Sequence, residues 1–401
     1  MNNLASVLKK DGWELNQKTG ERKPTKLHSG EWLAVLKKFY ASRLRFNLVT
    51  LLPEIDGQPV RGDQLELLYI DLNEKGWSIE PKPAKDAFLR AAKSNSYNPI
   101  KEYLELIEKD NSICPANIDL LSSTYLGTND TLYNSMLAAT LIGAVSRALT
   151  PGSQMDYICT LKGDQGIKKS SFWRILAGEY FCDTPQKDQK DLRLAIATTW
   201  IYEFQELEVM TTKRLAGEIK ALLTIRADTF RPPYGTLTES HPRGSIFVAT
   251  VNSDDFLRDE TGSRRFWIIE CPQLNGEQID IAKLEEERDS IWKAALIAYR
   301  SGRKPMLTHE EENKSHLRNT RYETENPLSI PIQNELARWP SREEFTTQEI
   351  LIEIFPARLE PFKPKEFRDT AIVLKQLGYK QDKNQTRKDG KRLRLWRRID
   401  E

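Results

Sequence analysis

The pattern of hydrophobic and polar positions changes twice along the chain, and each change predicts a different kind of structure. In residues 1–120, the run EWLAVLKKFYASRLRF has apolar residues every three or four positions, which predicts an amphipathic helix over residues 31–46. Two further runs, PKPAKDAFLRAAKS and NPIKEYLELI, have the same helical spacing. We therefore expect the N-terminal region to be mainly helical.

Residues 121–330 have short apolar runs that alternate with helical ones. Four of these runs are typical of buried strands: DYICTL, TTWIYEF, GSIFVATVN and RRFWIIEC, at residues 156–161, 198–204, 244–252 and 264–271. Buried strands that alternate with helices form parallel sheets with helices on both faces. We expect an α/β core of this kind.

Residues 331–401 differ again. Two helical runs, FTTQEILIEIF and KPKEFRDTAIVLKQLGY, precede an Asp-Gly turn signal and the run KRLRLWRR, whose alternation predicts an exposed strand. Helices followed by a basic hairpin suggest a small winged-helix module. The net charge of the chain is only +2, but residues 375–398 contain ten Lys or Arg and two Asp. Such local charge favours a nucleic-acid contact.

Composition narrows the class of protein. Hydrophobic residues make up 39% and charged residues 29%, as in folded globular proteins. No apolar run approaches the roughly 20 residues of a membrane span, and the N-terminus has no signal-peptide core. We expect a cytoplasmic protein with no membrane partner. The four cysteines form no CxxC pair, so neither a zinc site nor a disulfide framework is indicated.

A loop that follows the first apolar strand and opens a helix reads GDQGIKKS, close to the phosphate-loop pattern GxxxxGK[ST]. Backbone N–H groups of such a loop surround phosphate oxygens. Lys169 would reach the β- and γ-phosphates of ATP, and Ser170 would bind Mg²⁺. Lys168 stands where the pattern has glycine, so a lysine-rich turn is the alternative. The predicted nucleotide-binding residues are Gly163, Asp164, Gln165, Gly166, Ile167, Lys168, Lys169, Ser170 and Ser171.

Three further elements follow at the ends of the apolar strands. Glu203 and Glu206 stand where an acidic residue holds the metal and polarises water, and Glu203 joins Ser170 as a predicted metal ligand. Asn252 would orient the lytic water. Arg264 and Arg265 suit a phosphoryl transition state, in cis or from a neighbouring subunit. Taken separately, the glutamates could be an acidic helix start, Asn252 a turn residue and the arginine pair surface charge. All the elements occur in the expected order at strand ends, however, so a chance match of the whole set is a poor explanation.

The segment DTFRPPYG predicts a DNA-contacting loop. Its two prolines stiffen the backbone, so that Arg231 would contact phosphate and Tyr234 would stack on a base. The alternative for this segment is a structural loop with Tyr234 packed inside. For the terminal strand KRLRLWRR, the alternative is an exposed sheet edge protected by charge. The predicted DNA-binding residues are Arg231, Tyr234, Arg243, Lys391, Arg392 and Arg394.

These motifs resemble the virulence-associated protein E family of superfamily 3 helicases. The resemblance covers about residues 98–302 and rests on GDQGIKKSSFWRILAG, WIYEFQELE, DTFRPPYG and NSDDFLRDETGSRRFW. It implies an AAA+-like core that assembles into a ring, usually hexameric, and hydrolyses ATP with Mg²⁺ at subunit interfaces. It also implies movement 3′ to 5′ along single-stranded DNA during phage or mobile-element replication, and a trailing winged helix for duplex DNA. The roles carry over to Gly163, Gly166, Lys169, Ser170, Glu203, Glu206, Asn252, Arg264 and Arg265.

We divide the chain into an N-terminal region (1–120), a P-loop ATPase core (121–330) and a winged-helix module (331–401). Two functions remain open for it. The first is an ATP-driven DNA helicase. The second is a replication-initiator scaffold that binds nucleotide but hydrolyses it weakly, which Lys168 favours. A regulatory DNA-binding protein that acts mainly through its winged helix is a third, weaker reading.

Overall fold

The computed structural model contains two compact units, residues 1–322 and 323–401. The first two predicted regions lie together in the first unit, where one hydrophobic cluster is centred on the N-terminal lobe and another on the central sheet. None of the helices in the described part of the chain has the length and apolar character of a membrane span. The residues that the structure describes are 13–74, 76–186, 188–205, 213–253, 256–257, 263–271, 279–322, 328–340, 342, 344–382, 386–388 and 391–398.

The N-terminal lobe, residues 13–97, has short strands as well as the expected helices. The predicted helix over residues 31–46 ends at Tyr40, because Ala41 takes a φ of 47°, and the chain continues through a 3₁₀ turn, Ala41–Arg43, into a strand. The missed strands have only two to five residues, too few for an alternating pattern to stand out. The elements are β1 (Trp13–Leu15), β2 (Arg22–Lys26), α2 (Ser29–Tyr40), β3 (Leu44–Asn47), β4 (Leu52–Ile55), β5 (Gln58–Pro59), α3 (Gly62–Glu74), β6 (Trp77–Ser78), α4 (Pro81–Lys93) and β7 (Ser96–Tyr97).

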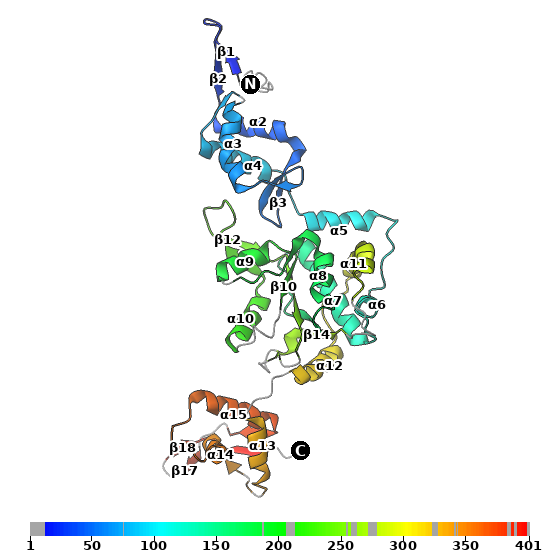
Figure 1. Ribbon diagram of the computed structural model, residues 1–401, viewed down its shortest axis with the longest axis vertical. Helices are drawn as coiled ribbons and strands as arrows, with labels where there is room; N and C mark the ends of the chain where they lie inside the picture. Colours follow the sequence, from blue (N-terminus) through cyan, green and yellow to red (C-terminus); the bar gives the residue numbers. More distant parts are fainter. Residues whose placement is uncertain are drawn as a thin grey trace. The chain divides into compact units, whose positions relative to one another are not determined.

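A five-stranded parallel sheet forms the centre of the first unit (Figure 1). The strand order is β14-β8-β13-β10-β9, and every neighbouring pair is parallel. All four predicted strands are present in it, which confirms the α/β prediction; only the two-residue β9 was missed. The strands are β8 (Ile158–Lys162), β9 (Phe181–Cys182), β10 (Ile201–Phe204), β13 (Ile246–Val251) and β14 (Phe266–Glu270).

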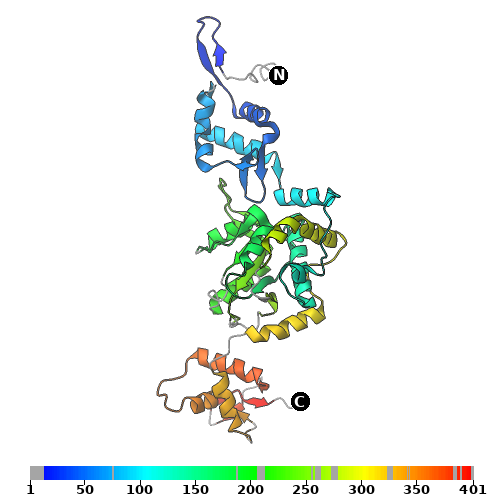
Figure 2. The same cartoon turned by 45° about the vertical axis from the view of Figure 1, so that its right-hand side comes forward.

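Helices cover both faces of this sheet, as Figure 2 shows from a second direction. Side chains alternate between the faces: Cys159 and Leu161 pack with α7, α8 and α11, whereas Ile158 packs with α9 and α10. A hairpin of β11 (Ala227–Phe230) and β12 (Glu239–Pro242) connects α10 to β13. The helices of this region are α5 (Pro99–Lys109), α6 (Leu121–Tyr125), α7 (Thr131–Leu149), α8 (Lys169–Ala177), α9 (Gln189–Ala197), α10 (Lys213–Thr224), α11 (Ile281–Arg300) and α12 (His309–Asn319).

In the second unit, the described residues form three helices and a three-stranded antiparallel sheet of order β15-β19-β16. The prediction that KRLRLWRR is a single exposed strand is wrong, because the segment contributes to both β18 and β19. Leu395 and Trp396 are buried, because β19 is the central strand and the Trp396 indole donates to Thr347 Oγ1 at 2.9 Å. The elements are α13 (Ser329–Ala337), β15 (Glu344–Phe345), α14 (Thr347–Ile354), α15 (Pro364–Gln376), β16 (Tyr379–Gln381), β17 (Thr386–Lys388), β18 (Lys391–Leu393) and β19 (Trp396–Arg398).

Candidate functional site

The loop between β8 and α8 is a tight turn that two glycines make possible. A Cβ on Gly163 would lie 2.6 Å from Ile167 Cδ1 and 2.8 Å from the carbonyl oxygen of Cys271, so no larger residue fits there. Gly166 has a φ of +89°, in the left-handed region. The first N–H groups of α8 face this loop, and the helix itself offers them no acceptor. The turn is therefore a suitable place for an anion.

Lys168, at the position of the expected glycine, adopts the backbone geometry that glycine would take. Its φ and ψ are 69° and 30°, the left-handed helical region, and its side chain is exposed. Such a conformation costs an L-residue about 1 kcal/mol. The lysine side chain therefore points outward, and Lys169 remains the first residue of α8.

The side chain of Lys169 connects the loop to the neighbouring strand. It is 6% exposed, and its ammonium donates to the carbonyl oxygens of Gly163 and Asp164 at 2.7 and 2.8 Å. It also donates to Asn252 Oδ1, directly after β13, at 3.0 Å. The predicted phosphate-binding lysine and the predicted sensor are thus brought together.

A second set of hydrogen bonds joins the loop to β10. Ser170 Oγ and Thr250 Oγ1 both donate to Glu203 Oε1, each at 2.7 Å. The second oxygen, Oε2, is buried and has no hydrogen-bond partner among the residues that the structure describes. Burial raises the pKa of Glu203, and the two hydroxyl hydrogen bonds oppose this. A carboxylate with one unsatisfied oxygen beside a serine hydroxyl suits a hard cation that prefers oxygen ligands.

Strand order explains why these groups meet. Because β13 lies between β8 and β10, Thr250 and Asn252 lie between the loop and Glu203. Sequence reasoning missed Thr250, whose signal was a single hydroxyl within the apolar run IFVATV; a buried hydroxyl needs a partner. Glu206, the other predicted acid, lies outside the described residues.

Arg264 and Arg265 lie at the other end of the sheet. They close a short 3₁₀ turn, Ser263–Arg265, directly before β14. Phe266 pairs with Ile158 at the start of β8, whereas Glu270 pairs with Lys162 at its end. At about 3.3 Å per residue, roughly 13 Å of strand separates the arginines from the loop. They line a cavity of about 580 Å³ with residues of α12, so they face away from the chain's own loop.

The two predicted DNA-contacting residues of the hairpin tip differ in exposure. Arg231 is exposed, and its Nε donates to the carbonyl oxygen of Gly235 at 2.5 Å. Tyr234 is half-buried against the N-terminal lobe, with Lys85 Nζ 5.1 Å from its ring centre. Burial raises the pKa of Tyr234, and Glu66 adds to this. The structure favours the packing alternative for Tyr234.

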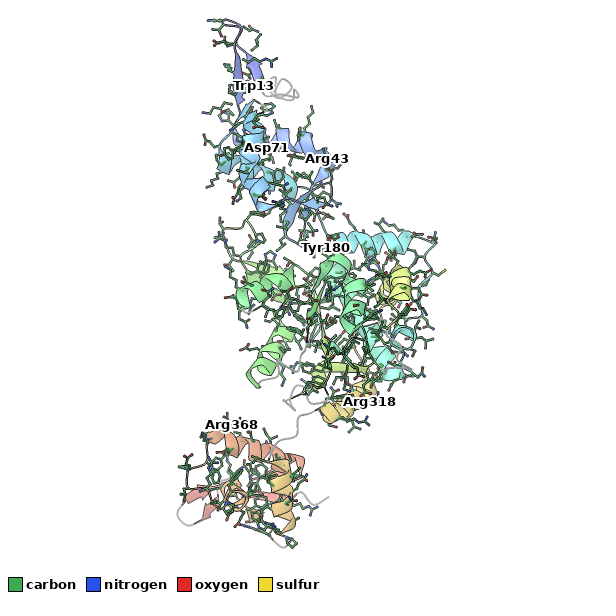
Figure 3. All side chains as sticks on the ribbon, viewed as in Figure 1. Trp13, Arg43, Asp71, Tyr180, Arg318 and Arg368 are labelled. Carbon is green, nitrogen blue, oxygen red and sulfur yellow. The ribbon has the colours of Figure 1, made fainter. Side chains whose placement is uncertain are left out.

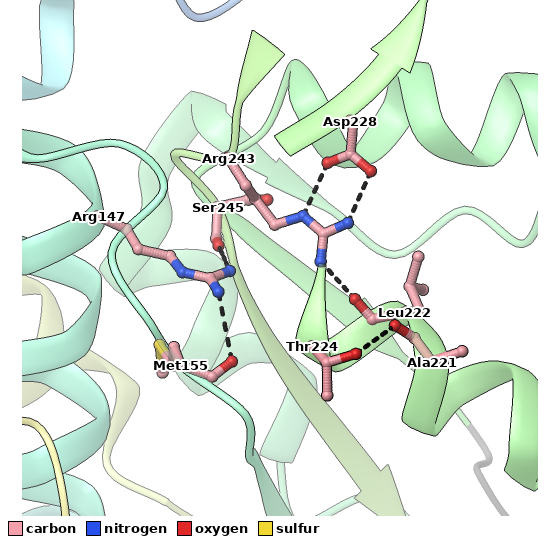
Figure 4. A network of polar contacts seen from close by, with 8 residues as sticks. All are labelled: Arg147, Met155, Ala221, Leu222, Thr224, Asp228, Arg243 and Ser245. Carbon is pink, nitrogen blue, oxygen red and sulfur yellow. Dashed lines mark hydrogen bonds and ion pairs between the residues drawn. The ribbon is translucent and has the colours of Figure 1, made fainter. Parts of the chain in front are cut away.

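The prediction that Arg243 contacts DNA is wrong. Its side chain is fully buried and forms a two-pronged ion pair with Asp228, with Nε–Oδ2 and Nη2–Oδ1 distances of 2.7 and 2.6 Å (Figure 4). Nη1 donates to the carbonyl oxygen of Leu222 at the end of α10. Arg243 therefore holds the base of the hairpin to α10. The sequence did not reveal this because the partner carboxylate is 15 residues away.

The far end of α8 contacts the N-terminal lobe through polar groups that sequence reasoning also missed. Asn47 Nδ2 donates to Glu54 Oε1 at 2.7 Å and to the hydroxyl of Tyr180 at 3.4 Å; Tyr180 is labelled in Figure 3. Tyr97 donates to the second oxygen of Glu54. Asn47 and Glu54 are buried. These residues join the N-terminal lobe to the turn that follows the helix of the phosphate loop.

The basic residues of the second unit are only partly described. Lys391 and Arg392 lie in β18, whose strand is described but not its side chains. Arg394 is exposed. Arg397 forms ion pairs with Glu344 at 2.5 Å and Asp382 at 3.5 Å. The predicted DNA-binding role of Lys391, Arg392 and Arg394 stays a prediction.

Comparison with known proteins supports the fold and shows the family. The apo structure of the C-terminal region (residues 305–718) of NrS-1 has a TM-score of 0.52 and 12% identity, covering 90% of this chain and 97% of that one. Its A form has a TM-score of 0.50 and 13% identity, covering 90% and 98%. At this identity the likeness concerns the fold. No curated protein matches the chain. The model of the virulence-associated protein E-like domain matches residues 111–324, more than half of the sequence. The chain therefore belongs to the virulence-associated protein E-like domain family.

Proposed function

We propose that this protein is an ATP-dependent DNA helicase or translocase of the superfamily 3 type. Its role would be replication of a phage or mobile element in the cytoplasm of a bacterial host. The proposal rests on two groups of hydrogen bonds at the carboxyl edge of the sheet, where the parallel strands end. Lys169 contacts Asn252, and Glu203 accepts from Ser170 and Thr250. Three strand ends thereby place a cation, an amide, a hydroxyl and a carboxylate around one phosphate-sized turn.

Each of these groups has a role in ATP hydrolysis. The ammonium of Lys169 exchanges its carbonyl acceptors for phosphate oxygens when the nucleotide binds. Ser170 and Glu203 would hold Mg²⁺, which would neutralise charge on the phosphates. Glu203 polarises the attacking water, and Asn252 orients it. The unsatisfied Oε2 of Glu203 is the acceptor that this chemistry needs.

The position of the arginine pair supports shared sites. Because Arg264 and Arg265 lie at the amino edge of the sheet, they are remote from their own phosphate loop. They act instead on ATP bound by a neighbouring copy, where a guanidinium stabilises the transition state. Such head-to-tail contacts form a ring when the rotation between neighbouring copies closes. By family likeness we propose a hexamer that moves 3′ to 5′ along single-stranded DNA.

The second unit supports a duplex-DNA role. Its elements follow the order helix, strand, two helices, strand, hairpin, strand, as expected of a winged helix, and Arg394 is exposed beside the hairpin β17–β18. Binding through this unit should fall steeply with salt, because each neutralised phosphate releases counterion.

A second function has one observation in its favour. The left-handed Lys168 is a strained residue in the phosphate loop, so the protein could instead be a nucleotide-binding initiator scaffold that hydrolyses ATP weakly. Steady-state ATPase assays with and without single-stranded DNA separate the two. The motor hypothesis predicts DNA-stimulated hydrolysis and fork unwinding that Lys169→Ala removes. Tight ATP binding with neither activity would establish the scaffold.

A further inference from the structure

The hairpin β11–β12 is held rigidly at its base. Four residue pairs connect its strands, from Ala227 opposite Pro242 to Phe230 opposite Glu239. Beneath them lies the buried pair of Arg243 and Asp228 (Figure 4). A buried ion pair whose hydrogen bonds are satisfied fixes the direction of the element that carries it. The hairpin therefore presents its tip, residues 231–238, in a defined orientation.

One side of this tip is already occupied by the protein itself. Phe230 is 3% exposed and belongs to the hydrophobic cluster of the N-terminal lobe. Tyr234 packs against the same cluster, and Lys85 lies over its ring. The aromatic ring that the sequence offers for base stacking is thus used to dock the hairpin. Another group must face the nucleic acid.

The exposed side chain of Leu237 is the group that we expect to face the nucleic acid. Its side chain is 72% exposed at the hairpin tip. The neighbouring Thr236 and Thr238 are exposed too, as is Arg231 at the other end of the tip. Hydroxyl and guanidinium groups bind the sugar–phosphate backbone, and leucine is one of the apolar residues that proteins insert between the base steps of duplex DNA.

We propose that Leu237 is the base-contacting residue of the hairpin, an apolar group that packs against or between the bases of single-stranded DNA. Tyr234 is then a positioning residue, which holds the tip against the N-terminal lobe. A protein partner fits less well, because one leucine among polar neighbours offers little of the roughly 800 Å² per partner of a stable protein interface. The inference deepens the proposed function and rests on it.

The test measures binding of a fluorescein-labelled oligothymidylate by anisotropy, with ADP present so that hydrolysis plays no part. Leu237→Ala should weaken binding about tenfold, as expected for a leucine that is buried on binding. Leu237→Phe should restore it, because an aromatic ring also packs on bases. Leu106→Ala is the matched control, since Leu106 is 69% exposed on α5, away from the hairpin; it should bind normally.

Salt dependence identifies the kind of contact. Leu237→Ala should leave the slope of log affinity against log salt unchanged, whereas Arg231→Ala should reduce its magnitude by about one. Normal binding by Leu237→Ala, with lost binding by a folded Tyr234→Ala, would overturn the proposal in favour of the tyrosine. A changed oligomeric state of Leu237→Ala without DNA would assign Leu237 to a protein contact instead. If wild type binds DNA through Leu237 but hydrolyses no ATP, only the motor function fails.

Discussion

Buried charged residues lie at both ends of the strands of the central sheet, but their surroundings differ. We call these the carboxyl edge, where the parallel strands end, and the amino edge, where they begin. At the carboxyl edge, Lys169 and Glu203 are buried, Glu203 keeps one unsatisfied oxygen, and Lys168 stands in a strained conformation. At the amino edge, Arg147 and Arg243 are also buried, and their side-chain hydrogen bonds end on backbone carbonyl oxygens or on Asp228. Burial of charge therefore does not mark a functional site. The difference is Glu203, whose Oε2 has no hydrogen-bond partner among the described residues.

The largest expected effect comes from breaking the satisfied network of the amino edge. Arg243→Met leaves the carboxylate of Asp228 buried without its partner, which should lower the free energy of unfolding by about 3–5 kcal/mol. The double variant Arg243→Met/Asp228→Leu removes both charges and should recover most of that loss. Denaturant titrations of the three proteins measure this. A double variant as unstable as the single one would mean that packing, not charge, sets the cost.

At the carboxyl edge, Lys169→Ala should lower the rate of ATP turnover by at least about a hundredfold, because it removes the cation from the γ-phosphate. It should cause little loss of stability. Arg265→Ala should be inactive as well, because Arg265, at the amino edge, is proposed to act on ATP bound by a neighbouring copy. If the neighbour supplies the arginine, mixing the two variants creates some intact sites and restores part of the ATPase activity. Two inactive variants that stay inactive at every mixing ratio would argue against sites shared between copies.

The third prediction concerns Glu203 and pH. Its pKa is raised by burial, so the folded state binds the proton more readily than the unfolded chain, and the ionised carboxylate costs stability at neutral pH. Stability from this group is greatest in acid and is lost as the pH rises through the raised pKa. Glu203→Gln should therefore stabilise the protein at pH 7 by about 1–2 kcal/mol while abolishing hydrolysis.

Melting temperatures of wild type and Glu203→Gln over a pH series test this directly. The gap between them should narrow as the pH falls towards 4.5, the ordinary value for a glutamate. Thr250→Val is a useful companion, because it removes one hydroxyl hydrogen bond to the carboxylate. A Gln variant that melts below wild type at pH 7 would mean that Glu203 is well solvated or paired in the folded state.

The same comparison explains what the sequence could reveal. The four predicted strands of the central sheet were predictable because each is a run of apolar residues that only a buried sheet accommodates, and their ends located Lys169, Ser170, Glu203 and Asn252. The strands of the N-terminal lobe were not, since they mix polar with apolar residues over only two to five positions. Arg243 was misassigned because charge along a sequence does not show whether a partner lies nearby in space. Tyr234 was ambiguous for the same reason.

The smallest expected effect is at Lys168, where strain and charge can be separated. Lys168→Gly relieves the left-handed backbone, but glycine also gains entropy in the unfolded chain, so the stability change should stay within about 1 kcal/mol. If only geometry matters, Lys168→Gly should keep or raise the rate of ATP hydrolysis. Lys168→Ala, which keeps the strain and loses the charge, should not raise it. If the outward ammonium attracts the triphosphate, Gly, Ala and Asn variants should all bind ATP more weakly, and high salt should reduce the difference. If the wild-type protein hydrolyses no ATP and Lys168→Gly alone does, the phosphate loop binds nucleotide without turnover, as the scaffold hypothesis states.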